Sequence, residues 1–136
     1  MAGFVFNRGA LSLQNGAINW QTADVRVRLS RTSEILDRDS AVMTGLGLPA
    51  TDRAVTGRIG PVEDVLADRI LYTSDPFAFP AVALGPEVDK AIVFAFGTND
   101  ADSVPIAVVT MTNPVTPNGG GILIDIDPLG MFYTQQ

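Results

Sequence analysis

The chain has 136 residues, 46% of them hydrophobic, and nine basic against fifteen acidic residues give a net charge of −6. This size predicts one domain with one core, and the negative charge disfavours nucleic acid as a partner. The absence of cysteine and histidine excludes thiolate and histidine catalysis and His/Cys zinc sites.

The charges are unevenly distributed. Residues 1–69 hold eight arginines and eight acidic residues, whereas residues 70–136 hold Lys90 and seven acidic residues. The acidic half could face a basic partner, but we favour a solvated surface that keeps the protein soluble. The first residues lack the features of a signal peptide and no apolar run approaches about eighteen residues. We therefore expect a protein that is soluble where it is made and binds no membrane.

Strand and turn signals begin near the N-terminus. Residues 4–7 and 11–14 have the pattern of short strands broken at Asn7, Arg8 and Gly9. The Asn-Gly pair at 15–16 is typical of the two-residue turn of a hairpin.

The clearest periodic signal lies in residues 24–30. Val25, Val27 and Leu29 alternate with polar residues, among them Arg26 and Arg28. This alternation predicts a strand with one buried and one solvated face, with both arginines on the solvated face.

The middle of the chain gives weaker signals. We expect mostly loop over residues 32–61, with at most a short helix at 33–43 that the following glycines and proline would end. Residues 61–71 are compatible either with a helix beginning at Pro61 or with two strands around a polar turn.

The second half predicts consecutive strands. Residues 91–96 and 106–111 are apolar on both faces and form a buried hairpin around a turn at 97–103, and further strands are expected at 121–127 and 131–134. Loops of four to nine residues are too short for a parallel crossover, so neighbouring strands are antiparallel. We predict an all-β fold, an antiparallel β-sandwich-like single domain over residues 1–136 with at most one short helix.

An apolar run ending in Asp-x-Asp at Asp125 and Asp127 resembles the nucleophile strand of haloacid-dehalogenase-type phosphatases. Those enzymes place this motif at the start of the fold, with parallel strands carrying further Lys and Asp residues after it. We instead expect both aspartates to be solvated positions of a late antiparallel strand, with Asp127 beginning a turn. A weak Ca²⁺ site there would need ligands from other loops.

Two loops superficially resemble ligand sites. Asn99, Asp100 and Asp102 resemble part of a calcium loop, but the EF-hand glycine and the late bidentate glutamate are missing. The glycines at 119–121 lack the Lys-Ser/Thr of a phosphate-binding loop. We expect a hairpin loop and backbone turns there, with no catalytic residue, no metal and no cofactor.

The order of these segments resembles a family of small structural proteins from tailed bacteriophages. The family's sequences begin with an Asn-x-Gly motif and a Leu-containing segment, followed by Gly-x-Ile-Asp/Asn and a strand with alternating apolar residues. They continue with an apolar strand and a Gly-Thr turn, and they end with a Gly-Gly strand that finishes in Gly-aromatic. The matching N-terminal positions are Asn7, Gly9, Leu11, Gly16, Ile18, Asn19, Asp24, Val25, Arg26, Val27 and Leu29. The chain departs from the family where "ATDRAVTGRIG" stands in place of a Gly-Tyr-Thr segment.

The resemblance implies a non-enzymatic virion protein, and it favours strands over a helix at 58–73. We expect a capsid decoration or cement protein that is made in the host cytoplasm and lies on the capsid surface. Its expected partners are the major capsid protein and copies of itself, as a trimer. A tail, baseplate or connector component is the alternative.

Aromatic residues are the candidates for the interface. Phe77 and Phe79 project to one side of an extended segment that flanking prolines stiffen. Together with Trp20 they are the predicted contact residues. The alternative is that all three belong to the core.

Overall fold

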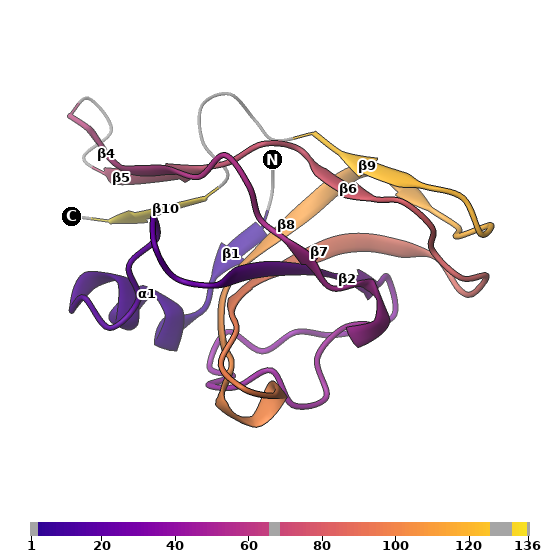
Figure 1. Cartoon of the computed structure of the whole chain (residues 1–136), viewed down its shortest axis with the longest axis horizontal. Helices are drawn as coiled ribbons and strands as arrows, with labels where there is room; N and C mark the ends of the chain where they lie inside the picture. The colour runs from indigo at the N-terminus through magenta and orange to yellow at the C-terminus, as the bar shows by residue number, and fades with distance from the viewer. Residues whose placement is uncertain (1–2, 66–68, 126–131, 136) are drawn as a thin grey trace.

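The structure is a computed structural model that describes residues 3–65, 69–125 and 132–135. It consists of antiparallel strands with one short α-helix, which confirms the predicted all-β, sandwich-like fold (Figure 1). Among the described residues, no helix has the length and apolar character needed to cross a membrane.

One layer is a five-stranded sheet with the order β1-β8-β7-β2-β3. Its strands are β1 (Gly3–Val5), β2 (Val25–Arg31), β3 (Arg53–Ala54), β7 (Val88–Ala95) and β8 (Val104–Val115). β7 and β8 form the predicted hairpin, and both of its faces are buried over residues 91–94 and 105–109.

The second layer contains two smaller antiparallel sheets, which lie above the large sheet in Figure 1. The first has the order β10-β5-β4, with β4 (Ile59–Asp64), β5 (Arg69–Thr73) and β10 (Phe132–Gln135). The second pairs β6 (Phe77–Phe79) with β9 (Ile122–Ile124). The segment that was compatible with a helix or two strands is therefore the β4–β5 hairpin.

The main core lies between the layers. From the large sheet, Val25, Val27 and Leu29 are at most 2% exposed and face buried aromatic and aliphatic side chains of β5, β6 and β9. The alternation in β2 correctly predicted which side chains face this core.

The other face of the large sheet is also covered, which the sequence did not predict. Residues 32–48 form no strand or helix, as expected, but they cross this face and bury a second apolar cluster (Figure 1). The buried members of this cluster are Phe6, Met43, Ile92, Phe94 and Val108. The polar face of β2 consequently lies largely beneath this segment, with Arg28 1% and Ser30 0% exposed. The prediction of a solvated face was wrong there.

The helix α1 spans Asn7–Gln14, where the sequence predicted strands. It packs on β8 so closely that a Cβ atom at Gly9 would lie 2.6 Å from the Cα atom of Ile106. The helix ends at Asn15, and Gly16 follows with a φ of 80°, so the Asn-Gly pair terminates a helix and does not join two strands. The tight contact with β8 favours the helix over the local strand pattern.

Candidate functional site

The three predicted interface residues lie in the main core. Trp20, Phe77 and Phe79 are 2–3% exposed. The Trp20 ring packs edge-to-face on Tyr72 with 5.7 Å between centroids, and its Nε1–H donates a 3.2 Å hydrogen bond to the Ile59 carbonyl. The burial of all three side chains agrees with the core alternative and corrects the prediction that they form an exposed interface.

Burial of Phe77 and Phe79 turns the intervening residue of β6 outward, since side chains alternate along a strand. Ala78 is exposed, and its partner in β9, Leu123, is 64% exposed between the buried Ile122 and Ile124. The β6–β9 pair thus presents a small apolar surface to solvent.

The β4–β5 hairpin presents a similar surface. Tyr72 is buried, so its neighbours Leu71 and Thr73 point outward, and the register pairs them with Val62 and Ile59. Val62 is 47% and Ile59 57% exposed.

These two surfaces belong to one layer of the molecule. We define the outer apolar face as the outward-pointing residues Ile59, Val62, Leu71, Ala78 and Leu123. They stand on hydrogen-bonded strands, so a partner would meet side chains that are already held in place. The alternation of large and small side chains in "FAF" indicates that two sides of that segment differ, but the three aliphatic residues of "ILI" give no such signal, and the sequence alone did not identify which side faces solvent.

Arg28, which sequence reasoning had placed in solvent, is a buried polar group that makes five side-chain hydrogen bonds. Its guanidinium donates to Asp52 at 2.7 and 2.8 Å, to Asp100 at 2.9 and 3.2 Å, and to the Leu46 carbonyl at 2.9 Å. All five of its N–H donors are satisfied, and it lies 4.8 Å from the centroid of the Phe94 ring. Burial alone would lower the pKa of Arg28, but its hydrogen bonds and ion pairs to Asp52 and Asp100 outweigh burial and raise it. A permanently charged, saturated guanidinium holds loops in place and has no donor left for a ligand.

The loop between β7 and β8 is closed by its own acidic residues. Asp102 accepts hydrogen bonds from the hydroxyl and the backbone N–H of Thr98 and from the backbone N–H of Asn99. The hydrogen bond from the Thr98 hydroxyl lowers the pKa of Asp102 most, and the two backbone hydrogen bonds lower it further. Because Asp100 is paired with Arg28, these side chains serve the loop, as the hairpin-loop prediction stated. In residues 3–65, 69–125 and 132–135, no three acidic side chains are grouped to hold a metal ion.

The Asp-x-Asp segment has no phosphatase-like surroundings in the part that the structure describes. Asp125 is exposed and directly follows β9, whose partner β6 is antiparallel. Phosphatases of that type require a buried parallel strand. Asp127 lies outside the described residues.

Comparison of the chain with protein-family models, curated proteins and solved structures finds no match.

Proposed function

We propose that the chain is a non-enzymatic structural protein of a tailed-phage particle that decorates the capsid and binds the shell of major capsid subunits. The observation that carries this proposal is the outer apolar face, in which Ile59, Val62 and Leu123 are 47–64% exposed on hydrogen-bonded strands. The order of sequence segments, which resembles phage virion proteins, points to the partner.

The outer apolar face is suited to an interface because its exposed aliphatic side chains sit on paired strands. Burial of apolar area stabilises association by roughly 25 cal/mol per Å², and rigid strands lose little conformational entropy on binding. Ile59, Val62 and Leu123 would supply such contacts.

A decorating protein stabilises a shell by linkage. If it binds the assembled subunits and not the separated ones, it lowers the free energy of the shell and raises the barrier to its opening. Symmetry-related sites on a shell favour a small oligomer, and we propose a trimer.

The test is sedimentation of the purified protein with empty shells and, separately, with tails. Decoration predicts that the protein sediments with shells, and that shells lacking it open at a lower temperature. Leu123→Asp should abolish co-sedimentation, because it places a charge in an apolar contact.

The matched control is Ile35→Asp, a substitution of another exposed aliphatic residue. Ile35 is 95% exposed and belongs to the segment that covers the opposite face of the large sheet. Ile35→Asp should sediment like the parent chain. Unchanged shell binding by Leu123→Asp would argue against the outer apolar face as the contact, and binding to tails alone would favour the tail, baseplate or connector role.

A further inference from the structure

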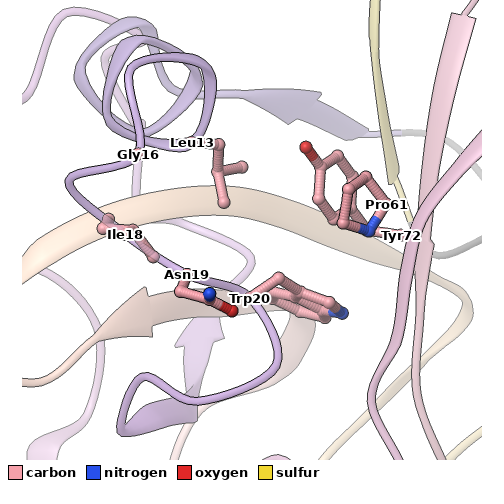
Figure 2. Close-up of a pocket in the computed structure, with 7 residues that line it drawn as sticks. All are labelled: Leu13, Gly16, Ile18, Asn19, Trp20, Pro61 and Tyr72. Atoms are coloured by element: carbon pink, nitrogen blue, oxygen red, sulfur yellow. The ribbon is translucent and has the colours of Figure 1, made fainter.

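A pocket of about 190 Å³ opens between α1, the segment that follows it and the β4–β5 hairpin (Figure 2). Its lining combines the apolar and aromatic side chains of Leu13, Ile18, Trp20, Pro61 and Tyr72 with polar atoms, among them the Tyr72 hydroxyl and the Asn19 amide, and Gly16 completes it. In Figure 2 the side chains of Leu13, Trp20 and Tyr72 surround the same space from three sides.

The walls of the pocket are held by contacts outside it. Trp20 is fixed by the edge-to-face contact with Tyr72 and by its bond to Ile59, and Arg58 donates to the Trp20 carbonyl at 2.9 Å. The backbone N–H of Ile18 donates to the Ser12 carbonyl at 3.0 Å, which joins the segment to the helix. The pocket therefore exists before any ligand enters.

The chemistry of the lining restricts what can bind. Among the residues that the structure describes, no charged side chain lines the pocket. The Oδ1 atom of Asn19 accepts a 3.0 Å hydrogen bond from the Gln21 N–H, which fixes the amide, while its Nδ2 donates to no acceptor among the described residues. A ligand is thus offered aliphatic and aromatic surface, the amide donor of Asn19 and, on the opposite wall, the side chain of Tyr72 with its hydroxyl.

The volume limits ligand size. Drug-sized ligands occupy pockets of about 300 Å³ or more, whereas a cavity of about 150 Å³ holds benzene. The pocket has room for one ring or one branched side chain.

We propose that this pocket binds a compact, neutral, mostly apolar group that presents one hydrogen-bond acceptor to the amide of Asn19. A free cyclic ketone or amide has this chemistry, and so does a leucine-like side chain with its own backbone carbonyl. The proposal does not depend on the capsid role, so either can fail alone.

The chain offers a direct reporter, because Trp20 is its only tryptophan. Its indole N–H gives one cross-peak in a ¹H–¹⁵N correlation spectrum of the labelled protein. Titration with cyclohexanone should shift this peak saturably, with a dissociation constant on the order of 1 mM, as expected for so small a ligand. Cyclohexylammonium, a charged molecule of the same size, should bind at least about tenfold more weakly because its charge would lose water in an apolar site.

Variants separate the pocket from other surfaces. Leu13→Phe should fill the pocket and remove the saturable shift, whereas Leu11→Phe, on the same helix at a position 55% exposed, should leave it unchanged. Asn19→Ala, at an exposed position, should weaken cyclohexanone binding about fivefold, the range for one lost hydrogen bond. Because Asn19→Ala removes no buried side chain, it tests the proposal even if Leu13→Phe fails to fold.

Comparison with N-acetyl-leucinamide identifies the source of the ligand. Tighter binding than cyclohexanone would assign the pocket to a side chain of a peptide or protein, and weaker binding would assign it to a free small molecule. Absence of a saturable Trp20 shift with either probe, or equal binding of cyclohexylammonium, would overturn the proposal.

Discussion

Arg28 on β2 and Asp100 in the β7–β8 loop are 72 positions apart in the chain, yet two hydrogen bonds of 2.9 and 3.2 Å join their side chains. Asp52 binds the same guanidinium, and it lies just after residues 32–48, the segment that covers this face of the large sheet. One buried side chain therefore ties two loops to the large sheet, and this arrangement leads to the first predictions.

Replacing Arg28 by alanine should destabilise the fold by about 3 kcal/mol, the lower end for breaking a buried ion pair. The lower end is expected because the side chains of Asp52 and Asp100 are 20% and 33% exposed and keep part of their hydration. Urea unfolding of both proteins measures the difference. The matched control is Arg26→Ala on the same strand face, whose partly exposed pair with Asp24 should contribute at most about 1 kcal/mol. Equal losses in the two variants would contradict a special role for Arg28.

Two glycines of the covering segment should respond differently to alanine. Gly45 and Gly47 have φ angles of 77° and 65°, so both substitutions carry the cost of a left-handed backbone, about 1 kcal/mol. A Cβ atom at Gly47 would also lie 2.6 Å from Cδ of Arg28, whereas nothing lies within 4 Å at Gly45. Gly47→Ala should therefore lose clearly more thermal stability than Gly45→Ala, by about 1–3 kcal/mol more. Equal melting temperatures would show that the Arg28 side chain moves aside without cost.

Asp102 should contribute a stabilisation that acid removes. Its pKa is lowered from the ordinary value of 3.8 by the Thr98 hydroxyl and by backbone N–H groups. A carboxylate whose folded pKa is depressed stabilises the fold fully above its unfolded pKa and loses this effect as the pH falls through the folded pKa. Asp102→Asn should therefore be less stable than the parent chain at pH 7, and the gap should narrow below about pH 4.

The control for this pH series is Asp125→Asn, at an exposed position directly after β9. It should change the stability by no more than about 0.5 kcal/mol at either pH. A gap between Asp102→Asn and the parent chain that is independent of pH would show that the Thr98 contact does not depend on the charge.

Phe79 should act as a core residue. Phe79→Ala should lower the free energy of unfolding by about 3–5 kcal/mol through lost burial and the cavity left behind, as measured by urea unfolding. Leu123→Ala, on the paired strand but 64% exposed, should change it by at most about 0.5 kcal/mol. A well-folded Phe79→Asp variant would instead restore Phe79 as an interface candidate.

The sequence by itself determined the strand β2 and the antiparallel β7–β8 hairpin. Val25, Val27 and Leu29 alternate with polar residues, and this period of two predicts a strand in isolation. Residues 91–96 and 106–111 are apolar on both faces, and the loop between them is too short for a parallel connection. These signals are local or depend only on loop length, so they needed no knowledge of distant contacts.

Tertiary structure decided what covers each face. Alternation shows that two faces of β2 differ, but only the closure of residues 32–48 over the sheet, with Asp52 and Asp100 in reach, could bury Arg28. The local sequence likewise did not determine the surroundings of Phe77 and Phe79. An extended segment with two aromatic residues on one side can pack them into the core or against a partner. At Asn7–Gln14, close packing of Gly9 on β8 selects a helix over the local strand pattern. In each case the deciding interaction joins residues far apart in the chain, whose encounter depends on the whole fold.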